Sequence, residues 1–142
     1  MSWVEHAHAT LQSAGYQRGG AREAVIDLLA GESCALSAQE IDDRLRGGSR
    51  SVGRASVYRS LELLATLKLV QRLDMGDGVA RYEAADPGGD HHHHVVCGRC
   101  GQIEPFHDPG LERAIERLAG RLSFAVDDHE VVLRGECSAC RN

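Results

Sequence analysis

The chain has 142 residues, of which 42% are hydrophobic, and this length suits one ordinary domain or two small domains with thin cores. Aromatic residues make up only 4% of the chain, which argues against recognition of single-stranded nucleic acid by base stacking. The formal net charge of −5 also argues against a DNA-binding protein, unless positive charge is concentrated in one segment.

The first half of the chain is predicted to form four helices and a β-hairpin. Apolar residues recur at helical spacing, and Ser37, followed three residues later by Glu40, forms a capping box that starts the third helix. After the fourth helix the apolar pattern changes to period two, and Asp77-Gly78 marks a tight turn. The expected helices are 3–14, 21–30, 37–45 and 53–69, and the expected strands are 69–74 and 79–84.

A helix-turn-helix followed at once by a hairpin is typical of a winged-helix DNA-binding domain, with the hairpin as the wing. Positive charge is indeed concentrated there: residues 44–72 contain seven basic residues and one acidic residue, a segment charge of about +6. The rest of the chain carries about −11. This distribution favours double-stranded DNA as a partner of the first half.

The second half is predicted to be a small α/β unit. The cluster of Gly, Pro and Asp at 85–90 indicates a hinge, which divides the chain into a DNA-binding domain at 1–84 and a second domain at 91–142. Asp108 and Pro109 start a helix that carries an apolar stripe. The expected strands are 91–97, 102–106, 124–127 and 130–136, the expected helix is 109–122, and its stripe is Leu111, Ile115, Leu118 and Leu122.

No apolar run approaches the roughly 18 residues of a membrane span, and the first residues, MSWVEHAHATLQ, have no signal-peptide pattern. We therefore expect a cytoplasmic protein without a membrane partner. In that reducing compartment, two Cys-x-x-Cys pairs favour metal binding over disulfides. Four thiolates in this spacing suit one tetrahedral structural Zn²⁺ without catalytic function, and two redox-active pairs are the alternative. The four cysteines are Cys97, Cys100, Cys137 and Cys140.

Four consecutive histidines precede the first cysteine pair. In a strand their side chains alternate, so His92 and His94 share one face while His91 and His93 share the other. Each pair can begin a metal site, and an incidental polar edge is the alternative. Candidates for the remaining ligands are Glu83 beside the first pair, and Glu112 and His129 beside the second.

Together these features resemble the ferric uptake regulator family of metal-dependent repressors over almost the full length of the chain. The matching segments are GYQRGGAREAVIDLL, SAQEI, GRASVYRSLELL, LVQRLDMGDGVARYE, HHHHVVCGRC and CSAC. The resemblance implies an N-terminal winged helix, a C-terminal dimerisation domain, and a homodimer that binds palindromic operators when a regulatory metal is bound. It thus implies a transcription regulator rather than an enzyme.

The resemblance also implies site residues. It assigns structural zinc to the four cysteines, a regulatory site to Glu83, His92 and His94, and an additional metal site to His91, His93, Glu112 and His129. The family's recognition helix carries a Tyr-Arg pair, and the residues expected to contact DNA here are Arg54, Ser56, Tyr58 and Arg59.

One departure from the family pattern bears on the regulatory metal. Where many members carry a histidine, this chain has Ala35, preceded by Cys34, which is either a substitute ligand or a buried small residue. A thiolate ligand would favour Zn²⁺, so a zinc uptake repressor is expected first. An iron-responsive repressor comes next, followed by manganese- and peroxide-responsive ones. Outside the family, a zinc storage or chaperone module and a zinc hydrolase are the competing interpretations.

Overall fold

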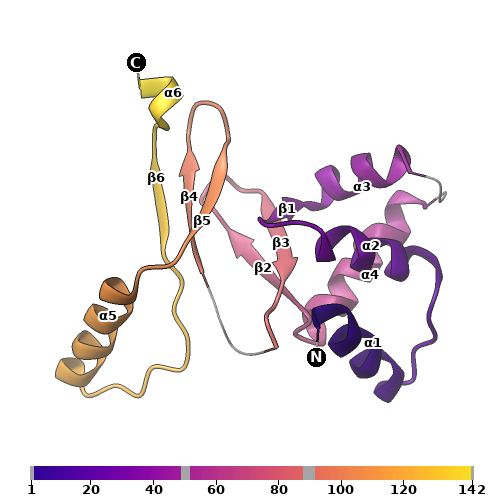
Figure 1. Ribbon diagram of the computed structural model, residues 1–142, viewed down its shortest axis with the longest axis horizontal. Coiled ribbons are helices and arrows are strands. Elements are labelled where there is room, and N and C mark those ends of the chain that lie inside the picture. The colour runs from indigo at the N-terminus through magenta and orange to yellow at the C-terminus, as the bar shows by residue number, and fades with distance from the viewer. Residues whose placement is uncertain (1, 49–51, 88–91, 142) are drawn as a thin grey trace. The chain divides into compact units, whose positions relative to one another are not determined.

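The computed structural model describes residues 2–48, 52–87 and 92–141. The chain separates into two compact units, Met1–Asp90 and His91–Asn142 (Figure 1). Part of the expected hinge, residues 88–90, lies outside the described residues, as do Arg50 and His91. Among the described residues, no helix has the length and apolar character needed to cross a membrane.

The described residues of the first unit form four helices and a three-stranded sheet (Figure 1). Its strands are antiparallel and lie in the order β1-β3-β2, with β2 and β3 paired from Val70↔Ala84 to Asp74↔Ala80. This hairpin is the predicted wing. The helices are α1 (Trp3–Ser13), α2 (Gly20–Ala30), α3 (Ala38–Arg46) and α4 (Arg54–Thr66), and the strands are β1 (Leu36–Ser37), β2 (Val70–Asp74) and β3 (Ala80–Ala84).

The start of α3 forms as the sequence predicts. The backbone N–H of Glu40 donates to the Ser37 side chain, while the backbone N–H of Ser37 donates to the Glu40 carboxylate, so the capping box is complete. The helices enclose one apolar core, whose fully buried members include Val25, Ile26, Ile41, Val57, Leu61 and Leu64. This core fixes α4 on α2 and α3, and so presents α4 as a rigid element.

Residues 92–141 of the second unit form a three-stranded sheet and two helices. The central strand β4 pairs antiparallel with β5 and parallel with β6. None of the described residues of the helix α5 is fully buried: in its apolar stripe Leu111 and Ile115 are half-buried, and Leu118 and Leu122 are exposed. The elements are β4 (His93–Cys97), β5 (Ile103–Phe106), α5 (Pro109–Leu122), β6 (Val132–Gly135) and α6 (Ser138–Arg141).

The strand expected at 124–127 does not form. Both edges of β4 are already occupied by β5 and β6, which leaves this segment no edge of β4 to pair with. Phe124 and Val126 are instead 71% and 49% exposed. Apolar side chains in an irregular, exposed segment are consistent with a surface that a partner covers.

Candidate metal centres and DNA-binding face

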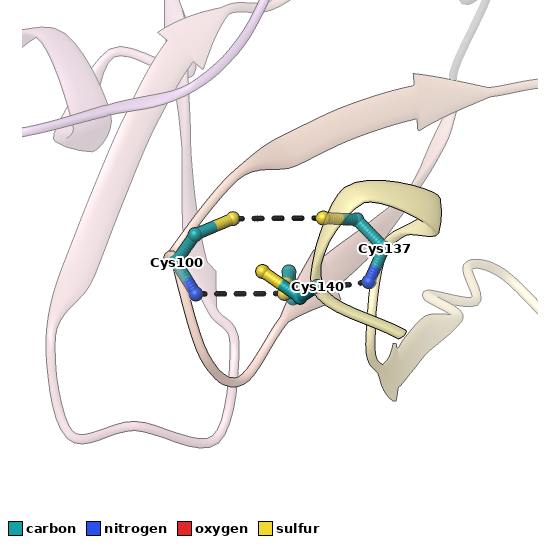
Figure 2. A group of neighbouring side chains, drawn as sticks. Cys100, Cys137 and Cys140 are labelled. Carbon is teal, nitrogen blue, oxygen red and sulfur yellow. Dashed lines mark hydrogen bonds between the residues drawn. The ribbon is translucent and has the colours of Figure 1, made fainter. Parts of the chain in front are cut away.

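The four cysteines converge at one end of the second unit. Cys97 ends β4, Cys100 follows in the tight turn before β5, and Cys137 and Cys140 lie at the short helix α6 (Figure 2). All four Sγ atoms lie within 4.8 Å of one another. Parallel pairing of Cys97 with Gly135 brings the C-terminal end of β6 beside the first cysteine pair. Sheet topology therefore assembles the cluster from two distant parts of the sequence.

The geometry of the four-cysteine cluster suits tetrahedral zinc. The Sγ atoms of Cys100 and Cys137 are 3.8 Å apart, much longer than the roughly 2.05 Å of a disulfide. With Zn–S bonds of about 2.3 Å, the sulfurs of a tetrahedral site are separated by about 3.8 Å. The spacing is thus that of ligands sharing one ion. Four protein sulfurs complete the coordination, which leaves no open position for substrate.

The electrostatics of the cluster also favour a cation. The backbone N–H groups of Cys100 and Cys137 donate to Sγ of Cys97 and lower the pKa of this thiol to about 6. The neighbouring sulfurs of Cys137 and Cys97 raise the pKa of the Cys140 thiol to about 12. Four adjacent thiolates repel one another, so the fully ionised set needs a bound dication.

A second group of metal-binding side chains surrounds Glu112 on α5. Nε2 of His93 lies 2.7 Å from one carboxylate oxygen of Glu112, and Nε2 of His129 lies 2.7 Å from the other. His93 is only 1% exposed. Two imidazoles and a carboxylate within 4.8 Å of one another form a ligand set suited to a divalent metal. His91, the fourth residue expected here, lies outside the described residues.

The protonation of His93 follows from its backbone contact. The N–H of Val131 donates to Nδ1 of His93 over 3.2 Å, so in the neutral ring the proton is on Nε2, which donates to Glu112. A neutral imidazole that binds metal through Nε2 carries its proton on Nδ1. If His93 bound metal through Nε2, its Nδ1 would carry the proton and could no longer accept the hydrogen bond from the Val131 N–H.

The residues expected to form the regulatory site come from both units: His92 and His94 belong to the second unit, and Glu83 and Cys34 belong to the first. In the second unit the rings of His92 and His94 are 4.9 Å apart, whereas His93 contacts α5, as the alternation of a strand predicts. In the first unit Glu83 lies in β3 opposite Gln71. Burial raises the pKa of the half-buried Cys34 thiol, and the Glu83 carboxylate raises this pKa further. The Cys34 thiol thus lies near enough to the Glu83 carboxylate for the two groups to interact electrostatically.

The expected DNA-binding residues lie on α4. Tyr58 is 42% exposed, which is high for a large side chain on a helix that packs into a core. Arg59 is also exposed and donates to the Ser56 hydroxyl over 3.1 Å. Arg54 donates from Nε to the buried carboxylate of Asp42 over 3.1 Å. The sequence did not single out Asp42, because an aspartate within a helix usually faces solvent.

The first unit is a winged helix whose helix α4 is exposed and partly basic. The second unit is a small sheet with one cysteine-rich and one histidine-rich cluster. This combination defines a class of metal-responsive DNA-binding regulators. The comparisons with known proteins agree. The Ferric uptake regulator family profile matches residues 13–134. The chain therefore belongs to the ferric uptake regulator family, whose members are transcription regulators rather than enzymes.

Individual relatives match over nearly the whole chain. The ferric uptake regulation protein of Bacillus subtilis (strain 168) is 35% identical over 139 residues, which are 96% of this chain and 93% of that protein. The peroxide operon regulator of the same organism is 30% identical and covers 96% of this chain and 92% of its own. The Helicobacter pylori ferric uptake regulator, described as having three functional metal binding sites, superposes with a TM-score of 0.86. It is 26% identical, and the match covers 99% of this chain and 93% of that one.

Proposed function

We propose that this protein is a repressor that binds a palindromic operator as a homodimer when Glu83, His92 and His94 hold a regulatory divalent metal. One observation carries the proposal: a carboxylate and two imidazoles, the ligand types of such a site, lie on the two sides of the segment that connects the two units. The membership of the chain in a family of metal-responsive regulators supports it.

The proposed mechanism uses the connection between the units as a hinge. Ligands from both units that share one ion restrict the angle at which the DNA-binding unit is held. The two recognition helices of a dimer must reach successive major grooves about 34 Å apart, so this restriction pre-organises the dimer for its operator. A 100-fold preference of the metal for the DNA-binding conformation corresponds to about 2.7 kcal/mol, enough to switch binding.

Two metals are candidates for the regulatory site, and a separate observation favours each. Zn²⁺ is favoured by Cys34, which lies near enough to Glu83 for the two groups to interact electrostatically and whose thiolate would suit a four-coordinate zinc site. Fe²⁺ is favoured by the relative that is 35% identical and is named for ferric uptake. Glu83, His92 and His94 by themselves suit both ions.

Operator binding under controlled metal concentrations tests the proposal. Operator duplexes are first selected from a random-sequence library with the metal-loaded protein, and affinity is then titrated with buffered Zn²⁺ and Fe²⁺. We expect Glu83→Gln to lose the metal-induced gain in affinity while retaining the four-cysteine zinc, whereas Glu104→Gln, an exposed change on β5, serves as the matched control.

The same titration separates the two metals. If zinc is the regulator through Cys34, Cys34→Ala loses the zinc response. An unchanged zinc response in Cys34→Ala removes the argument for zinc, and a response to Fe²⁺ alone identifies an iron regulator. Duplex binding that is independent of every metal, or no duplex binding at all, would contradict the proposed repressor and favour a zinc storage module.

We also propose roles for the second unit. Its four cysteines bind structural zinc, and His93, Glu112 and His129, joined by His91, form the additional metal site. The homodimer interface includes the exposed apolar stripe of α5, because Leu118 and Leu122 are 44% and 58% exposed on a helix with no buried residue.

A further inference from the structure

Asp42 connects the two helices that form the helix-turn-helix. It lies on α3, is 0% exposed, and accepts hydrogen bonds from two of the described arginines at the same oxygen, Oδ2. Arg46 at the end of α3 donates over 2.9 Å, and Arg54 at the start of α4 donates from Nε over 3.1 Å. One buried carboxylate therefore holds two arginines on either side of the connecting loop.

A contribution to folding stability does not explain why Asp42 is buried beside two arginines. A carboxylate loses its hydration on burial, and replacing a buried ion pair by apolar residues is often neutral or stabilising. In addition, Oδ1 of Asp42 is buried without a hydrogen-bond partner among the described residues, which adds a desolvation cost. The arrangement is better explained by what it does to the two arginines.

The two guanidinium groups remain accessible although Asp42 anchors them. The side chains of Arg46 and Arg54 are 56% and 53% exposed, and Arg54 uses only Nε in its contact with Asp42. An arginine held at Nε keeps its two terminal nitrogens for another acceptor, and planar guanidinium groups suit phosphate. Asp42 thus fixes the positions of the two guanidinium groups, while both groups remain exposed to solvent.

The surroundings of the pair also favour an anion. The N-cap residue of α4 is Gly53, which makes no side-chain hydrogen bond to the first turn, so backbone N–H groups at this end need other acceptors. Arg44, another basic residue of α3, has a different kind of partner from Arg46 and Arg54. It forms a salt bridge with Glu32, whose side chain is 26% exposed, rather than with a buried carboxylate.

We propose that Asp42 is a positioning residue for DNA binding, which holds Arg46 and Arg54 as a pair that contacts phosphates of the DNA backbone beside the start of α4. This inference rests on the proposed function, since it assumes that α4 is the recognition helix. Phosphate contacts of this kind set the register of the protein on the duplex without reading its sequence.

The negative charge of Asp42 makes the test decisive, because a positioning role and a general electrostatic effect predict opposite changes in the affinity for DNA. Asp42→Asn removes a negative charge from a DNA-binding unit, so general electrostatics predict tighter binding to DNA. A positioning role predicts weaker binding, because the arginines lose their anchor. Asp43→Asn is the matched control: it makes the same charge change at the next position, where the exposed Asp43 contacts only Gln39 among the described residues.

The experiment measures the affinity of the metal-loaded, full-length protein for a mixed-sequence duplex of about 30 base pairs at several salt concentrations, since phosphate contacts are sequence-independent. We expect Asp42→Asn to weaken binding at least tenfold and to reduce the slope of log affinity against log salt by at least about 2 per dimer, since each protomer loses one or both of its arginine contacts to phosphate. Asp43→Asn should bind as the wild type does or more tightly.

Arg54→Lys serves as a second variant in case Asp42→Asn does not fold, which circular dichroism and the fluorescence of Trp3 report. Lysine keeps the charge but cannot hold Asp42 and a phosphate at once, so the same loss of affinity and salt slope is expected. Unchanged or tighter binding by a folded Asp42→Asn, or by Arg54→Lys where Asp42→Asn does not fold, overturns the inference. If the wild type binds no duplex, the proposed function fails first and the inference with it.

Discussion

The Sγ atoms of Cys100 and Cys137, which are 37 residues apart in sequence, lie 3.8 Å from each other. Around them the second unit has few buried apolar residues, chiefly Val96 and Cys97 among those described. A unit of this size needs a further constraint to stay folded, and a zinc ion shared by four sulfurs would supply it.

Cys100→Ser is therefore expected to lose one tightly bound zinc per chain and to lower the melting temperature, because three thiolates bind the ion less well and the second unit loses its cross-link. In a small domain each lost kcal/mol lowers the melting temperature by about 4–8 °C. Elemental analysis and calorimetry check the two effects. Cys34→Ser, a cysteine change in the first unit, is the control and should keep this tightly bound structural zinc; a structural zinc content unchanged in Cys100→Ser would exclude the proposed centre.

Glu112→Gln should abolish the additional metal site, because the amide that replaces the carboxylate is a weak ligand and no longer accepts from both His93 and His129. We expect the affinity for metal beyond the structural zinc to fall at least tenfold, measured by competition with a chelator of known affinity. Glu116→Gln, an exposed change on the same helix, should have no effect. Equal metal binding by both variants would refute the site.

Ser37→Ala is expected to destabilise the first unit by about 1 kcal/mol, since the backbone N–H of Glu40 loses its acceptor. Urea unfolding can be followed through Trp3, the single tryptophan, whose indole N–H donates to the carbonyl oxygen of Leu69 in the same unit. Gln39→Ala, an exposed change in the same turn, should cost less. A smaller loss in Ser37→Ala than in Gln39→Ala would contradict the role of the cap.

Leu122→Glu should weaken the homodimer, because it places a charge in the apolar stripe that a second copy is expected to cover. We expect the dissociation constant to rise at least tenfold, equivalent to about 1.4 kcal/mol, in analytical ultracentrifugation. Arg121→Glu introduces the same side chain at the neighbouring exposed position and should have a smaller effect. If both changes act alike, the stripe is not the interface.

Much of the fold could be predicted because its signals are local. The capping box at Ser37, the turn at Asp77-Gly78 and the N-cap at Asp108 each depend on residues within a few positions, and all three stand where expected. The two-residue strand β1 was missed, since so short a strand exists only through its pairing with β3. The strand expected at 124–127 was wrong for the converse reason, because an apolar pattern forms a strand only where it pairs, and both edges of the central strand β4 are taken by β5 and β6.

The sequence by itself was enough to recognise the family, to pick out the four cysteines as one candidate site and to divide the histidines between two faces of a strand. These features depend on spacing and strand alternation, which are properties of neighbouring residues. The sequence offered Glu112 and His129 only as candidates beside His93, and the tertiary structure decided that one carboxylate oxygen of Glu112 meets each imidazole at 2.7 Å. It alone decided that Asp42 is buried. Burial and long-range contact depend on how helices pack, and a polar residue on a helix has the same local pattern whether it meets water or two arginines.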